Sequence, residues 1–192
     1  GAEIYGEYAS SKSLSVLIGT AIVMSLALVV TKVLAQNSEN SKLMFSNSYY
    51  IITRNFLITL LLLFPITLLF QRSFSMTALF LMGFVFNEMI HVALAFFQAQ
   101  GDFVTSSKQI FVRTIIYGIG AWIIVFQGFS IISLISFQVF MLGIFFIFAH
   151  ISIPKNNKIS QIKSTPHVRD DLQNSGRKMV LTTFSSALIS EL

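Results

Sequence analysis

The feature that most constrains the fold is an apolar run without a formally charged residue over residues 131–153, IISLISFQVFMLGIFFIFAHISI. An α-helix rises ~1.5 Å per residue, so this run would extend ~34 Å and exceed the ~30 Å hydrocarbon core of a bilayer. Helices of water-soluble proteins rarely carry apolar side chains on every face. The chain is therefore expected to span a membrane.

The composition supports this class and excludes several others. Hydrophobic residues make up 54% of the chain and charged residues 11%, unlike a disordered chain or an ordinary globular domain. The absence of cysteine excludes disulfide bonds, thiolate metal sites and cysteine nucleophiles. The net charge of +5 can be interpreted only from the positions of the basic residues.

Five apolar segments are long enough to cross a bilayer. They cover about residues 14–34, 50–70, 76–97, 110–126 and 131–153. Pro65 predicts a kink in the second segment, which is tolerated where neighbouring helices satisfy the freed carbonyl. The turns at 71–73 and 127–130 are short, which predicts tight antiparallel pairs of helices.

The C-terminal part of the chain contains the expected domain boundary. Residues 154–178 form a polar stretch with two prolines, which we interpret as a cytoplasmic loop between two lobes. A further apolar pattern over 179–192 is expected to be the start of another transmembrane helix. The predicted fold class is an all-α polytopic transmembrane bundle over residues 1–153, and we expect the chain to be a fragment of a longer protein.

The basic residues predict the orientation of the bundle. With the loops 35–49, 98–109 and 154–178 on one side, only Lys12 and Arg72 fall on the other side. This asymmetry predicts that the three loops are cytoplasmic, so the positive charge is a topology signal and no nucleic-acid partner is expected. Anionic lipid headgroups are an additional partner for the third loop. The cytoplasmic set is Lys32, Lys42, Arg54, Lys108, Arg113, Lys155, Lys158, Lys163, Arg169, Arg177 and Lys178.

Glu88 and His91 lie in the middle of the third predicted span. A charge at mid-bilayer costs ~2.5–3.5 kcal/mol on insertion scales, so both side chains should face protein or water. They could bond each other at i, i+3, form a proton or cation site, or line a substrate cavity. A metal-bound catalytic site would need a second Glu-x-x-His and further carboxylates. Helical spacing gathers a stripe of Gly83, Asn87, Glu88, His91, Ala95 and Gln98, on which Phe84 intrudes.

Three basic residues, Lys32, Arg54 and Arg113, lie about one turn inside the predicted cytoplasmic ends of their spans. One interpretation is that their side chains extend to the lipid headgroups. The alternative is a basic vestibule that attracts an anionic substrate such as a phosphate. Arg113 shares a helical face with Tyr117 and Gly120, which favours an inward direction.

The sequence contains no motif that nominates a catalytic set. Neither a Ser/His/Asp order, a Walker loop nor an HExxH motif is present. We therefore expect a protein that is not an enzyme, without catalytic residues, metal or cofactor.

The opening segment, GAEIYGEYASSKSL, carries a Gly-x-x-x-Tyr-Gly pattern at Gly1, Tyr5 and Gly6. Further along, AFFQAQGDFVTSSKQIFVRTIIYGIGAWI contains Gly101 and Arg113. Together with TKVLAQ and RKMVLTTFSSALISEL, these segments resemble the N-terminal lobe of bacterial polysaccharide flippases, which export O-antigen and capsule repeat units. Two departures are a missing first helix and the lack of the proline that usually opens the seventh helix, here at 180–182.

The resemblance implies one lobe of a two-lobe, MATE-like transporter whose central cavity opens alternately to each side of the bacterial inner membrane. The implied substrate is an undecaprenyl-diphosphate-linked oligosaccharide, flipped to the periplasmic leaflet for surface polysaccharide synthesis. Implied partners are membrane lipids and polysaccharide-assembly membrane proteins. Glu88 and His91 would couple transport to protons. The implied substrate-binding residues are Lys32, Arg54 and Arg113 for the diphosphate, and Asn87, Gln98 and Tyr117 for the sugar.

Two other functions are alternatives. A cation-coupled multidrug extruder of the same architecture would have an acidic cavity centred on Glu88, whereas basic residues outnumber this acid in the spans. A membrane glycan polymerase would need large periplasmic loops, and the short turns at 71–75 and 127–130 argue against it.

Overall fold

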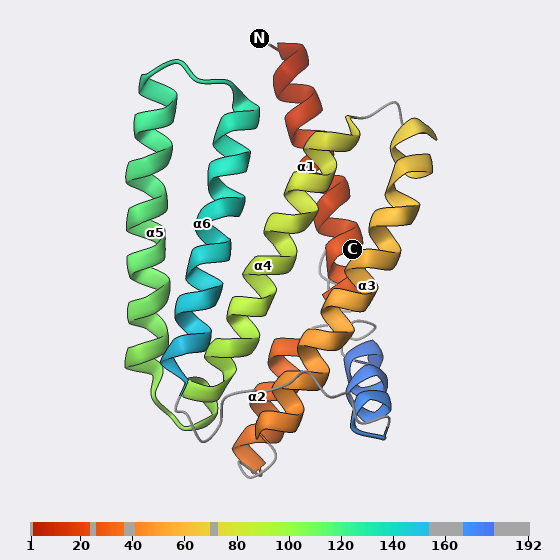
Figure 1. Cartoon of the computed structure of the whole chain (residues 1–192), viewed down its shortest axis with the longest axis vertical. Coiled ribbons are helices and arrows are strands. Elements are labelled where there is room, and N and C mark those ends of the chain that lie inside the picture. The colour runs from red at the N-terminus through yellow and green to blue at the C-terminus, as the bar shows by residue number, and fades with distance from the viewer. Residues whose placement is uncertain (1, 24–25, 37–40, 70–72, 154–166, 179–192) are drawn as a thin grey trace, which may run out of the picture.

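The structure is a computed structural model that describes residues 2–23, 26–36, 41–69, 73–153 and 167–178. Every regular element in these ranges is a helix, which confirms the predicted all-α class for the described part of the chain. The labelled helices in Figure 1 are α1 (Ala2–Val23), α2 (Leu26–Gln36), α3 (Ser41–Leu69), α4 (Phe74–Ala99), α5 (Phe103–Phe126) and α6 (Ile131–Ser152).

Five helical segments in the described ranges are long and apolar enough to cross a membrane. The first comprises α1 and α2 and extends from Tyr5 to Gln36, and each of α3 to α6 supplies one more. The expected bundle of membrane-spanning helices is therefore present by length and composition.

Several helices begin earlier than predicted. The first begins at Ala2, α3 begins at Ser41, and α5 begins at Phe103. The added turns are rich in polar residues, so apolar periodicity could not mark them. In α5 the beginning is set by a cap instead, because the Asp102 side chain accepts a hydrogen bond from the Thr105 backbone N–H at 3.0 Å.

Two short turns join α4, α5 and α6, and serine residues cap the beginnings of α4 and α6. Ser73 and Ser130 cap α4 and α6 by accepting hydrogen bonds from backbone N–H groups three residues later. Gly101 and Gly128 have φ angles of 75° and 73°, a left-handed conformation that glycine adopts at little cost. These turns reverse the chain direction, so α4, α5 and α6 run alternately up and down in Figure 1.

Helix α4 is the central element of the bundle. It packs against α1, α2, α3, α5 and α6. Ala93, Leu94 and Ala95 are fully buried in succession, so this part of α4 has no lipid-facing side. A core of apolar side chains from the neighbouring helices surrounds it, including Leu26, Val30, Phe45, Ile51 and Ile52.

Helix α5 is the peripheral element. It packs on α6 and, less extensively, on α4, and its most apolar window contains no buried residue. Large side chains such as Phe111, Ile119, Trp122 and Phe126 are exposed along it. An apolar surface of this extent is typical of contact with lipid or with another protein.

The predicted connecting segment over 154–178 contains a helix in its second half, over residues 167–178. Leu172 in this helix is 2% exposed and joins the apolar core, with Val168 packed beside it. These two apolar positions lie one turn apart within a polar stretch, which is why composition alone indicated a loop. Residues 154–166 and 179–192, including the predicted start of the next transmembrane helix, lie outside the described residues.

Candidate functional site

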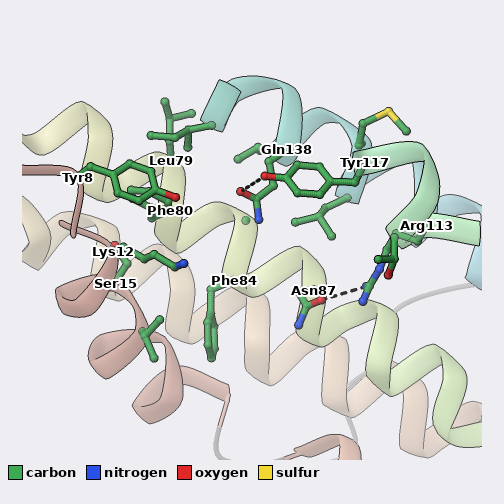
Figure 2. A pocket seen from close by; sticks show the side chains of 17 residues that line it. Tyr8, Lys12, Ser15, Leu79, Phe80, Phe84, Asn87, Arg113, Tyr117 and Gln138 are labelled. Carbon is green, nitrogen blue, oxygen red and sulfur yellow. Dashed lines mark hydrogen bonds between the residues drawn. The ribbon is translucent and has the colours of Figure 1, made fainter. Parts of the chain in front are cut away.

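A cavity of about 420 Å³ is lined by side chains from α1, α4, α5 and α6. Apolar residues such as Phe80, Phe84 and Leu142 form much of its wall. A small number of polar groups in an otherwise apolar cavity is typical of ligand sites. The polar side chains on the described lining are Tyr8, Lys12, Ser15, Asn87, Arg113, Thr114, Tyr117 and Gln138, and most are labelled in Figure 2.

Two basic residues give the cavity its charge. Lys12 extends from α1 and Arg113 extends from α5 (Figure 2). The Lys12 Nζ atom lies 6.0 Å from the ring centroid of Tyr8, within the range of a cation–π contact. Neither aspartate nor glutamate occurs on the described lining, so the wall of this cavity is cationic.

Arg113 lies well inside α5, because this helix begins before the apolar span. Since α5 begins at Phe103, Arg113 is ten residues along it, about 15 Å from the start. The side chain is partly buried, and its Nη1 atom donates a hydrogen bond to Asn87 Oδ1 at 3.0 Å. Arg113 therefore faces the cavity, in the inward direction that its shared face with Tyr117 predicted.

A second polar pair lies one turn further along α5. The Tyr117 hydroxyl donates a hydrogen bond to Gln138 Oε1 of α6 at 3.4 Å. The Tyr117 ring also stacks on Phe137, with ring centroids 6.3 Å apart and an angle of 15° between the rings. These two contacts fix the orientation of Tyr117 relative to the cavity.

Helix α1 forms the opposite part of the wall and is held closely against α4. The Ser15 hydroxyl donates to the Thr77 carbonyl at 2.9 Å, a contact between buried groups. Tyr8 meets Phe80 edge to face with ring centroids 5.1 Å apart. Gly19 leaves room for the Phe84 ring, since a Cβ atom there would approach that ring to 2.5 Å.

Three predicted substrate-binding residues line the cavity and three do not. Asn87, Arg113 and Tyr117 lie on its wall. Lys32 is exposed near the end of α2, and Gln98 is partly buried on α4 away from the lining. The remaining one, Arg54, also lies outside the lining.

Arg54 serves a different contact from the predicted one. It lies thirteen residues after Ser41, about 20 Å along α3. Its Nη2 atom donates to Asn55 Oδ1 at 3.1 Å, and the Asn55 amide donates to the Ile22 carbonyl at 3.1 Å. The pair thereby connects α3 to the end of α1.

Glu88 and His91 are partly buried on α4 but do not line the cavity. In the described part of the chain, Glu88 and His91 form no hydrogen bond with each other. The Glu88 carboxyl interacts with Asn87 instead. His91 lies within range of the Arg113 charge. A direct bond at i, i+3 is therefore wrong. Among the described residues, no three His, Asp or Glu side chains come together.

Sequence reasoning missed several residues of the cavity. Lys12 was interpreted only as a charge marking the outer side, and Tyr8 and Gln138 were not singled out. Gln138 carried a signal, because it is an amide inside an otherwise apolar span. Lys12 and Tyr8 precede the apolar part of their helix, so nothing in the sequence marked them as cavity residues.

Comparison with known protein families, with curated proteins and with solved structures gives no match for this chain.

Proposed function

We propose that the bundle is one lobe of a polysaccharide flippase that carries an undecaprenyl-diphosphate-linked oligosaccharide across the bacterial inner membrane. The observation that carries the proposal is the cationic cavity, where Lys12 and Arg113 face the same space from different helices. Cationic side chains in a cavity attract an anionic headgroup such as a diphosphate. The chemistry supports a headgroup site inside the membrane-spanning part of the protein.

The guanidinium of Arg113 is suited to the diphosphate in particular. It has five N–H donors, and the described hydrogen bond to Asn87 uses one of them. A planar guanidinium can bind two oxygens of one phosphate at the same time, whereas the Lys12 ammonium acts as a point charge. Asn87 holds Arg113 in the position from which the remaining donors can bind.

The other cavity residues suit the remaining parts of the same substrate. Tyr117 and Gln138 offer hydroxyl and amide groups to sugar hydroxyls, and Tyr8 and Phe80 offer aromatic surfaces. The apolar exterior of α5 can remain in contact with the hydrocarbon interior, where the prenyl tail of the substrate would lie. One amphiphilic substrate therefore matches the charged, polar and apolar surfaces together.

The test is transport by the full-length protein in proteoliposomes that contain a fluorescent undecaprenyl-diphosphate oligosaccharide. We expect the Arg113→Gln variant to translocate at least about tenfold more slowly, since a charge-assisted hydrogen bond contributes ~1.5–3 kcal/mol. The matched control is Lys108→Gln, which removes the same charge from an exposed position on the same helix, outside the lining. This control should translocate at the wild-type rate.

Two outcomes would contradict the proposal. A wild-type protein that leaves the labelled lipid in its original leaflet would show that this substrate is wrong. Transport of cationic dyes that depends on an ion gradient and disappears in Glu88→Gln would instead support the multidrug extruder. That alternative derives its support from Glu88, an acid within the span beside Asn87.

A further inference from the structure

We infer that Gln138 and Tyr117 select the glycan, while Arg113 and Asn87 hold the charged diphosphate. This inference rests on the proposed function and concerns the sugar end of the same substrate. It assigns a specificity-determining role to Gln138, which neither the motifs nor the resemblance indicated.

The cavity contains two hydrogen-bonded pairs of different chemistry. Arg113 with Asn87 is charged, whereas Tyr117 with Gln138 is neutral, and Figure 2 shows both pairs on the cavity wall. Helix α5 supplies one member of each pair, and Arg113 and Tyr117 are four residues apart on one face, ~6 Å along the helix. The two pairs therefore lie at neighbouring turns of α5, as a phosphate and an attached sugar would require.

The hydrogen-bonding capacity of the neutral pair matches a sugar better than a phosphate. In the described contacts, Gln138 uses its Oε1 atom to accept from Tyr117, which leaves the two N–H donors of Nε2. The Tyr117 oxygen donates its hydrogen to Gln138 and retains lone pairs as an acceptor. A sugar hydroxyl both donates and accepts, whereas a phosphate oxygen at neutral pH only accepts. The Tyr117 acceptor is therefore useful only toward a donor such as the sugar hydroxyl.

The neutral pair is also held in place, as discrimination between sugars requires. The stack of Tyr117 on Phe137 fixes the plane of the ring. Gly120 lets Phe137 approach α5 closely, because a Cβ atom at Gly120 would overlap the Phe137 ring. A preorganised polar group rejects a substrate that leaves it without a partner, since a buried unpaired group is costly.

The experiment measures binding of three probes to the purified full-length protein by thermophoresis. The probes are undecaprenyl diphosphate without sugar, the same lipid with glucose, and the same lipid with N-acetylglucosamine. We expect Gln138→Ala to lower the affinity for both sugar-bearing lipids about fivefold, with different factors for glucose and for N-acetylglucosamine. The affinity for the sugar-free lipid should fall less than twofold. Tyr117→Phe should give a smaller loss with the same pattern. Gln127→Ala, a glutamine in the turn after α5 and outside the lining, is the matched control.

The comparison between probes separates the glycan-selecting role of Gln138 from the flippase proposal. An equal loss for all three probes in Gln138→Ala, or no loss for any, would overturn the glycan-selecting role while leaving the flippase proposal in place. A wild-type protein that binds none of the three lipids would overturn both. A reduced affinity of Arg113→Gln for all three probes, with the preference between the sugars retained, would support separate roles for the charged pair and the neutral pair. Thermal unfolding of each variant checks that these changes do not arise from misfolding.

Discussion

At the scale of single residues, the hydrogen bond between Arg113 and Asn87 is the contact on which the cavity depends. Arg113 carries a permanent charge at the middle of α5, and the described lining offers it an amide oxygen and no carboxylate. An amide dipole orients a guanidinium without neutralising it, so the positive charge remains to attract an anion. A carboxylate at position 87 would neutralise this charge.

The strength of this contact can be measured with a double-mutant cycle. We expect a coupling free energy of about 1.5–3 kcal/mol between Asn87→Ala and Arg113→Ala, because a hydrogen bond to a charged group has this order of magnitude. The measurement is unfolding of the protein in detergent, with the single and double variants compared. Additive effects of the two substitutions would show that the contact contributes nothing to stability.

A substitution at Gly19 tests whether lipid binding depends on the shape of the cavity. In Gly19→Ala the new Cβ atom would meet the Phe84 ring, so the ring must rotate and the packing between α1 and α4 should lose about 1–3 kcal/mol. We expect weaker binding of undecaprenyl diphosphate because Phe84 lines the cavity.

The matched control for this prediction is Gly118→Ala on α5, where a Cβ atom would meet nothing within 4 Å. Thermal unfolding and lipid binding of this variant should equal or exceed those of the wild type, since alanine favours the helix. Equal behaviour of the two variants would show that Phe84 is not constrained by Gly19.

The sequence predicted three cavity residues that stand out against an apolar background, and Gln138, which stands out in the same way, was missed. Asn87, Arg113 and Tyr117 are polar groups inside apolar spans, and each lines the cavity. Arg54 had the same appearance but binds Asn55, because the direction of a side chain depends on neighbours that are distant in sequence. Lys12 could be recognised only after the early beginning of α1 was known.

At the scale of the helices, the beginning of α5 is controlled by a titratable cap. The hydrogen bonds from the Thr105 side chain and backbone N–H lower the pKa of Asp102 below its usual value. A lowered folded-state pKa means that the cap stabilises the helix above the unfolded pKa and loses this effect as the pH falls through the folded value. Fraying of the first turn of α5 is therefore expected only in acid, below about pH 4.

Amide hydrogen exchange in the first turn of α5 checks this prediction, with rates corrected for the pH dependence of intrinsic exchange. Asp102→Asn keeps an oxygen that can accept the hydrogen bond but removes the titration, so its protection should not change between pH 3 and pH 6. An equal pH dependence in this variant and in the wild type would assign the fraying to another group.

The helix over 167–178 is expected to depend on one apolar anchor. Leu172→Ala removes the side chain that joins the core, at a cost of about 2–5 kcal/mol for a buried leucine. The helix should detach from the bundle, and trypsin should cleave faster after Arg169 and Arg177. Asn174→Ala, at an exposed position of the same helix, should be cleaved at the wild-type rate. Unchanged cleavage of Leu172→Ala would mean that other contacts hold the helix.

The existence of the spanning helices and the beginning of α6 followed from the sequence, but the beginnings of α1, α3 and α5 did not. Hydrophobic length identifies the part of a helix that lies in lipid, while a polar cap such as Asp102 can begin the helix several residues earlier. The same limit concealed the helix over 167–178, whose burial rests on few apolar side chains. The composition of such a helix is mostly polar, so it does not reveal the few apolar side chains that pack against the bundle.

At the scale of the whole molecule, the up-and-down arrangement gives each turn a predicted side of the membrane. The chain contains no cysteine, so single cysteines can be introduced without background labelling. In intact cells we expect an impermeant maleimide to label Gln127→Cys, in the turn between α5 and α6, and to spare Asn174→Cys. Labelling of Asn174→Cys after permeabilisation is the control. The reverse pattern would invert the orientation predicted from the basic residues.

The bundle as a whole was more predictable than its internal arrangement. Five apolar segments with short connections are sufficient to indicate antiparallel packing, but they do not indicate which helix is central. The central position of α4 became evident only from its contacts with five other helices. A pattern on one helix could not show this, because both of its faces are buried by partners.

The position of α4 has a consequence for biogenesis. The ribosome completes α4, with Asn87, Glu88 and His91, before it makes the helix that carries Arg113. Until α5 is synthesised, these polar groups lack that partner, so early release of α4 into lipid would be unfavourable. The insertion machinery would then have to retain α4 until the next helix emerges, and the order of synthesis becomes a condition for assembling the cavity.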